Sequence, residues 1–130
     1  MPTLPEQLRA RTKQFAIRIV RVFKSLPKED EARIIGKQLL RSGTSVAANY
    51  RAVCRSRSKA EFISKMSVVA EEADETVFWI ELLFETRIIR EVRLQELHKE
   101  AKELLAIFAA SVWTARQKRR SAPTNVAVVQ

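Results

Sequence analysis

The chain is poor in residues that interrupt helices. It has only two glycines and four prolines among 130 residues. Three prolines lie within residues 1–27 and the fourth lies at Pro123, so residues 28–122 contain no proline. Because glycine and proline are the residues least compatible with a helix interior, this scarcity predicts long helices.

Several other features are missing, and each absence excludes a class of protein. One cysteine, Cys54, allows neither an intrachain disulfide nor a cysteine-based metal cluster, which fits a reducing cytoplasm. No apolar run reaches the roughly 18 residues of a membrane span, and the N-terminal segment MPTLPEQLRARTKQF lacks the apolar core of a signal peptide. We therefore expect a cytoplasmic protein that does not bind a membrane.

The residues that usually carry catalysis are equally scarce. His98 is the only histidine, and we expect it to pack at the edge of the core. No E-x-x-H motif is present, as a di-iron bundle would need, and no glycine-rich phosphate loop exists. Cys54 has arginine neighbours that could activate a thiol, but we expect it to be a small buried residue. The sequence thus predicts no enzyme, cofactor, metal or small-molecule substrate.

Charge is present in excess and is distributed unevenly. The net charge is +9. Residues 1–60 hold 14 basic and 4 acidic groups, whereas residues 61–100 hold 5 basic and 10 acidic groups. A basic excess favours a polyanionic partner such as nucleic acid. The opposite signs also favour contact between one half of a chain and the other half of a neighbouring copy.

Apolar residues recur at helical spacing in four segments. We predict helices from about Pro5 to Ser25, from Lys28 to Arg55, from Lys59 to about Arg87, and from Arg93 to Lys118. The predicted core residues are Leu8, Phe15, Ile19, Val22 and Leu26, then Ile35, Leu39, Val46, Tyr50 and Val53, then Phe62, Met66, Val69, Ala73, Val77, Ile80 and Phe84, and lastly Leu94, Leu97, Ala101, Leu105, Phe108, Val112 and Ala115.

Four helices joined by short connections predict an all-α fold, an up-down-up-down antiparallel four-helix bundle over residues 1–120. Residues 121–130 are expected to form a mobile tail. Ser58 and Glu61 form a capping box that sets the start of the third helix. In the second helix, Gly36, Gly43, Ala47 and Cys54 share a side, where small residues would let another helix approach closely.

The third helix contains the run VFWIELLF, residues 77–84, which is apolar on nearly every side. One side continues the core stripe. The opposite side holds Phe78 and Leu82, with Trp79 adjacent. Large apolar side chains gathered on a monomer surface are unusual, so we predict that another copy of the chain covers them. The predicted oligomer interface comprises Glu71, Glu75, Phe78, Trp79, Leu82 and Glu85.

Basic residues form an outward ridge on the second helix and continue beyond it. As a nucleic-acid site, such residues would contact the phosphate backbone, with little sequence preference and a strong dependence on salt. Solubility charges or salt bridges between subunits are an equally good interpretation. The candidate nucleic-acid-binding residues are Arg33, Lys37, Arg41, Arg51, Arg55, Arg57, Lys59, Lys118, Arg119 and Arg120.

Three short motifs carry a resemblance to a known family. They are SVAAN at residues 45–49, SKAEF at residues 58–62, and the segments EADE and WIELL within residues 72–83. With these motifs the chain resembles the small four-helix-bundle proteins encoded in intervening sequences of bacterial 23S ribosomal RNA genes. The resemblance implies a homopentameric ring and a family whose members mostly have no established function. A related branch, the accessory variability determinants of diversity-generating retroelements, associates with a reverse transcriptase and nucleic acid.

These observations lead to two hypotheses about function. The first is a non-enzymatic homo-oligomeric scaffold or adaptor whose cellular role is unestablished. The alternative is a basic accessory protein that binds RNA or DNA, acting with a reverse transcriptase in the branch that the resemblance includes.

Overall fold

A computed structural model of the chain describes residues 1–121, and within them every regular element is an α-helix. The helices are α1 (Leu4–Ser25), α2 (Asp30–Val53), α3 (Lys59–Glu85) and α4 (Glu91–Ser121). The predicted all-α class with four helices is confirmed. The second helix is shorter at both ends than predicted, and the fourth extends further at both ends. The predicted tail lies almost entirely outside the described residues.

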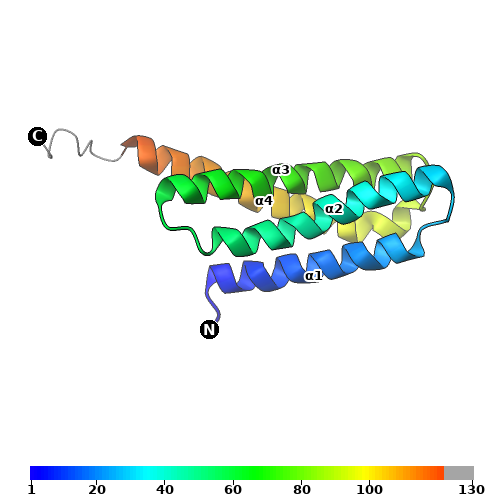
Figure 1. The fold of residues 1–130 in the computed structure, drawn as a ribbon, viewed down its shortest axis with the longest axis horizontal. Helices are drawn as coiled ribbons and strands as arrows, with labels where there is room; N and C mark the ends of the chain where they lie inside the picture. Colours follow the sequence, from blue (N-terminus) through cyan, green and yellow to red (C-terminus); the bar gives the residue numbers. More distant parts are fainter. Residues whose placement is uncertain (122–130) are drawn as a thin grey trace, which may run out of the picture.

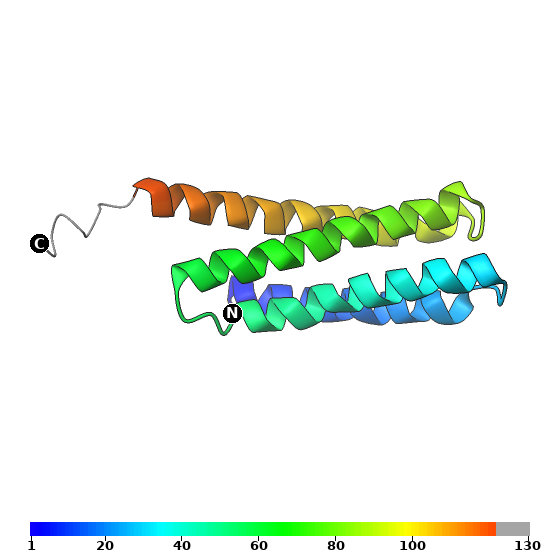
Figure 2. The same cartoon turned by 45° about the horizontal axis from the view of Figure 1, so that its top comes forward.

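The four helices lie side by side, and each runs opposite to the one before it (Figure 1). α1 and α2 form one layer and α3 and α4 form the other (Figure 2). Contacts are extensive between consecutive helices and sparse between α1 and α4. No helix in the described part of the chain is long and apolar enough to span a bilayer.

One ion-pair cluster joins α1 to α4 across their sparse contact. Arg11 donates two hydrogen bonds to the carboxylate of Glu100, at 2.8 and 2.7 Å, and a third to Glu103 at 3.3 Å. The hydrogen bond from Arg11 holds the pKa of Glu100 below its ordinary value. Such a two-point contact fixes the relative position of two helices better than a single charge pair does.

Local sequence explains where two of the helices begin. Thr3 and Glu6 form a reciprocal capping box at the start of α1, with proline in the first turn. At α3 the predicted box is half formed. The amide of Glu61 donates to the Ser58 hydroxyl at 3.1 Å, but the Glu61 carboxylate accepts from the Arg57 amide rather than from Ser58.

The core follows the predicted stripes closely. Most of the predicted residues are buried, and the others, such as Val22, Ile35 and Leu105, are partly buried at its edge. The buried apolar side chains that the stripes did not include are Ala32, Leu83, Ile89 and Leu104. The buried hydroxyl groups of Thr12, Ser42 and Thr76 each donate to a backbone carbonyl of the preceding turn, so none is left without a partner.

The small residues of α2 do bring a helix close, as predicted. A methyl group built on Gly43 would lie 2.7 to 3.0 Å from three side-chain carbons of Ile19 in α1. On Gly36 it would lie 2.4 Å from Cδ1 of Leu26. The close packing of α1 on α2 therefore requires that positions 36 and 43 carry no side chain. Cys54 does not belong to this side. It caps the C-terminus of α2 and is exposed, so the prediction that it is buried is wrong.

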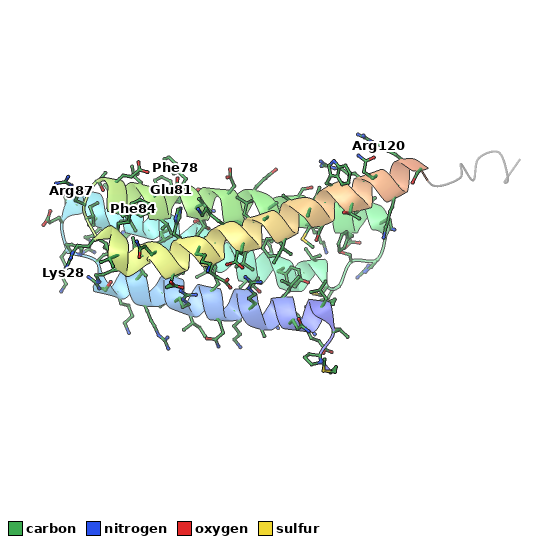
Figure 3. All side chains as sticks on the ribbon, turned by 180° about the vertical axis from the view of Figure 1, so that it is seen from behind. Lys28, Phe78, Glu81, Phe84, Arg87 and Arg120 are labelled. Carbon is green, nitrogen blue, oxygen red and sulfur yellow. The ribbon has the colours of Figure 1, made fainter. Side chains whose placement is uncertain are left out.

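The turn after α3 adopts a glycine-type conformation without a glycine. Arg87 has a φ of 63°, and it lies at the end of the bundle opposite Arg120 (Figure 3). The amide of Ile88 donates to the Leu83 carbonyl at 3.0 Å, and the amide of Arg87 donates to the Phe84 carbonyl at 3.1 Å. These two bonds are the Schellman pattern, which ends many helices and normally places glycine where Arg87 stands.

We therefore expect Arg87→Gly to stabilise the protein. A side chain in the left-handed region costs about 1–2 kcal/mol, of which the greater entropy of unfolded glycine cancels about 0.4–1 kcal/mol. The net gain should be about 0.5–1 kcal/mol, measured by urea unfolding at one protein concentration. Arg87→Ala, which keeps the β-carbon, should leave the stability nearly unchanged. Equal stability of the two variants would contradict this account.

Candidate interaction surfaces

The outward side of α3 carries an exposed aromatic residue. Phe78 is 52% exposed and lies on the outer side of α3 (Figure 3). Its ring meets that of Trp79 edge to face, with centroids 4.8 Å apart. Trp79 itself is partly buried against the core, and its Nε1 donates to Glu75 Oε1 at 3.1 Å. Leu82 is also only partly exposed. We expected all three side chains to lie exposed on the surface of a single chain, but only Phe78 does so, and Trp79 and Leu82 are partly buried.

Arg41 and Glu75, which the sequence assigned to different surfaces, contact each other within one chain. The Arg41 guanidinium donates to Glu75 and, at 3.1 Å, to Glu72 Oε2. These hydrogen bonds raise the pKa of Arg41, and the bonds from Arg41 and Trp79 lower the pKa of Glu75. The pair lies between α2 and α3, because Arg41 leans from the ridge toward the neighbouring helix. Both residues thus already have partners before any second molecule binds.

This ion pair also shows which residues of α2 lie beside the aromatic cluster. Side chains seven residues apart lie on the same side of a helix, two turns apart. Because α2 and α3 run in opposite directions, Ile34, seven residues before Arg41, lies opposite Leu82, seven residues after Glu75. Ile34 is 65% exposed. Ile34, Phe78, Trp79 and Leu82 therefore form one apolar strip across the outer side of α2 and α3, hereafter the α2–α3 strip.

The acidic interface residues that remain are Glu71 and Glu85. Both are exposed on α3, and neither forms an ion pair within residues 1–121. They lie on the same outward side as Phe78. The predicted interface thus consists of an apolar centre with two carboxylates available at its rim.

The basic ridge of α2 is intact apart from Arg41. Arg33, Lys37, Arg51 and Arg55 are exposed, and none of them forms an ion pair within the described residues. The structure adds two residues of α1 that the sequence analysis missed. Arg9 and Lys13 line a groove of about 450 Å³ together with Arg51 and small residues of α2. The sequence could have revealed them by their spacing, because residues four apart lie on the same side of a helix.

The remaining basic candidates gather at one end of the bundle. Arg57, Lys59 and Lys118 line a single cavity there. Arg120 lines a separate groove between α3 and α4, together with Arg116 and Trp113, which is 64% exposed. Arg119 lies exposed in the last turn of α4. The predicted nucleic-acid residues thus fall into two groups, one along α2 and one at this end.

His98 occupies the core edge, as predicted. Its Nε2 lies 2.8 Å from Glu81 Oε2, and its ring meets Phe84 edge to face at 5.4 Å. Figure 3 shows Glu81 and Phe84 on α3 near the turn that leads to α4. Among residues 1–121 no three histidine, cysteine or acidic side chains come together in a way that could hold a metal ion.

Comparison with known proteins identifies relatives of the chain. The sequence profile of a family described as "23S rRNA-intervening sequence protein" matches residues 7–110. The chain is also similar to a crystal structure of a protein of unknown function from the S23 ribosomal protein family of Bacteroides thetaiotaomicron, with a TM-score of 0.74 and 34% identity. That match covers 80% of this chain and 96% of the other. No curated protein matches.

Proposed function

Because the chain belongs to the family of 23S rRNA-intervening sequence proteins, we propose that its up-down-up-down antiparallel four-helix bundle is the subunit of a ring-shaped homopentamer. In this proposal the ring acts in the cytoplasm as a non-enzymatic scaffold or adaptor. The observation that carries the proposal is the α2–α3 strip, in which Phe78 is 52% exposed and Ile34 is 65% exposed.

A second copy of the chain is the occupant that best fits this strip. Fully burying an exposed large apolar side chain contributes about 1.5–3 kcal/mol. Most of the driving force therefore comes from Ile34 and Phe78, since Trp79 and Leu82 are already partly buried in one chain. Glu71 and Glu85 at the rim are complementary to Arg33 and Lys37 on α2. When the acidic α3 side of the strip in one copy meets the basic α2 side in the next, the contact is head-to-tail, and such contacts close into rings when the rotation between copies permits.

Tryptophan fluorescence tests this interface at its centre. In a Trp113→Phe variant Trp79 is the only tryptophan. We expect acrylamide to quench Trp79 weakly at high protein concentration and more strongly on dilution, because dissociation uncovers the strip. The converse Trp79→Phe variant reports Trp113, which lies outside the α2–α3 strip in the groove between α3 and α4, and its quenching should depend on concentration much less than that of Trp79. A concentration-dependent Trp113 signal with a constant Trp79 signal would place the interface on the wrong side of the molecule.

The basic groove supports the alternative function, an accessory protein that binds RNA or DNA. Arg9, Lys13 and Arg51 converge on one groove, with Arg33 and Lys37 along α2 and Arg55 in the turn that follows it. Their charges would neutralise backbone phosphates, and a ring would repeat the groove in every subunit.

Salt dependence distinguishes the two functions. For the accessory protein we expect affinity for a generic RNA to fall steeply, by orders of magnitude between roughly 50 and 200 mM salt. Arg9→Gln with Lys13→Gln and Arg51→Gln should weaken binding to all sequences alike and reduce the salt slope. Absence of binding at low salt would exclude this alternative and leave the scaffold.

A further inference from the structure

A cavity lies at one end of the bundle. It has a volume of about 800 Å³ and is lined by the first turn of α1, the end of α2, the α2–α3 turn, the start of α3 and the last turns of α4. It forms because α4 continues beyond the first turn of α1 (Figures 1 and 2), and because α1 contacts α4 only sparsely. The end of the bundle is therefore not filled by its own helices.

The floor of this cavity is apolar. Val53, Phe62 and Ala115 line it beside Tyr50. Tyr50 is only 3% exposed and packs on Phe108 with ring centroids 5.7 Å apart. Burial raises the pKa of its phenol to about 12, so the hydroxyl group is neutral at physiological pH. The floor thus offers flat hydrocarbon surface and no negative charge.

All charged residues that line the cavity are basic. They are Arg57, Lys59 and Lys118, and none of the three side chains forms an ion pair within residues 1–121. Hydroxyl groups add to them: those of Ser56 and Ser111 already donate to backbone carbonyls, which leaves those of Ser58 and Thr114. Ser58 accepts a hydrogen bond from the Glu61 amide and retains its own proton for donation. Thr114 of α4 lines the cavity as well. Several donors and three positive charges therefore surround an apolar floor.

Two further grooves described above do not combine these properties. The groove of Arg9, Lys13 and Arg51 has about half the volume, and its apolar lining consists of alanines. The groove beside Trp113 includes Glu71, which would repel an anion. Ligand sites typically have volumes of about 300–1,000 Å³, with mostly apolar walls and a few polar groups that orient the ligand. Of the three, the cavity at the end of the bundle fits this description best.

We propose that this cavity binds an organic anion, with its apolar body on Phe62 and Val53 and its phosphate, sulfonate or carboxylate between Arg57, Lys59 and Lys118. The two halves of the ligand match the two halves of the site. A charged headgroup without an apolar body would leave the apolar floor of the cavity exposed to water. A neutral apolar molecule would leave the three basic side chains without an anionic partner. This site is separate from the α2–α3 strip, so it does not depend on the proposed ring interface.

Cys54 provides a local reporter, since it is the only cysteine, is exposed and lines the cavity. The probe is anilinonaphthalene sulfonate, an aromatic sulfonate, and the readout is the rate at which neutral iodoacetamide alkylates Cys54 in the full chain. We expect the probe to slow alkylation saturably, at one probe per chain. N-phenylnaphthylamine, the same ring system without the sulfonate, should protect much less.

Two triple variants, each lacking three positive charges, test whether the effect is specific to the cavity. Arg57→Gln with Lys59→Gln and Lys118→Gln should weaken protection by roughly tenfold or more, because charge-assisted hydrogen bonds are lost. Arg9→Gln with Lys13→Gln and Arg51→Gln removes the same charge from the groove between α1 and α2 and should change the protection of Cys54 by less than about twofold. Thr114→Phe, at an exposed position, should fill the cavity and abolish protection.

Three results would overturn the proposal. The two triple variants could weaken protection equally, which would show attraction to net charge alone. The probe could bind without slowing alkylation, which would place it elsewhere. Removal of residues 122–130 could by itself speed alkylation several-fold, which would show that the chain's own end occupies the cavity.

Discussion

Replacing Phe78 by Glu and Leu82 by Lys is expected to convert the assembly into folded monomers. Each apolar side chain contributes about 1.5–3 kcal/mol when covered, and burying the new charges without partners costs more. A loss of more than about 3 kcal/mol at each contact weakens association over a hundredfold. Phe78 is 52% exposed and Leu82 is partly exposed within one chain, so the variant should keep its helix content by circular dichroism.

A matched control introduces the same charges at other exposed apolar positions. Val92→Glu in the first turn of α4 and Val20→Lys in α1 leave the α2–α3 strip unchanged. This variant should keep the mass of the unmodified protein in light scattering. If the Phe78 and Leu82 variant also kept that mass, the strip would not be the interface.

Replacing Gly43 by Ala is expected to destabilise the fold, whereas the same change at Gly36 should have little effect. Both glycines face α1, but their neighbours differ in freedom to move. A β-carbon on Gly43 meets three carbons of Ile19, which is fully buried and branched. A β-carbon on Gly36 meets mainly the end of Leu26, a partly exposed side chain that can rotate away.

The expected magnitudes follow from two opposing terms. Overpacking a core costs about 1–3 kcal/mol, while alanine favours a helix over glycine by about 1 kcal/mol. Gly43→Ala should therefore lose up to about 2 kcal/mol, and Gly43→Val about 3 kcal/mol or more because valine is larger and a poorer helix former. Gly36→Ala should stay within about 1 kcal/mol of the original protein. Urea unfolding at one protein concentration measures all three, and equal effects of the two alanines would contradict the packing described here.

The helices and most of the core could be predicted from the sequence because both depend on local patterns. The absence of breakers sets the helix lengths, Ser58 marks where α3 begins, and apolar spacing gives the buried side. Which of two neighbouring apolar residues is fully buried depends on how the helices pack, and the sequence pattern does not show this. The stripe selected Leu105, but Leu104 is the fully buried residue. A straight helix drifts by roughly 20° from a seven-residue repeat in each heptad, so a long stripe shifts to a neighbouring position.

The interaction surfaces were harder to predict, because a helical wheel gives a direction but not the neighbouring helix. Arg41 belongs to the ridge by spacing, yet it leans toward α3 and pairs with Glu72 and Glu75. Part of the charge complementarity attributed to neighbouring copies is thus used within one chain. The cavity at the end of the bundle is assembled from five segments, and no single stretch of sequence reveals it. Cys54 was misplaced because α2 ends one residue earlier, at Val53.

The mass of the full chain in solution, measured by light scattering across a range of concentrations, tests most directly whether the α2–α3 strip is a subunit contact. One chain has a mass of 14.9 kDa. We predict a particle of five chains at high concentration that loses mass on dilution. A particle of one chain at every concentration, with Phe78 and Ile34 exposed to water, would contradict the account.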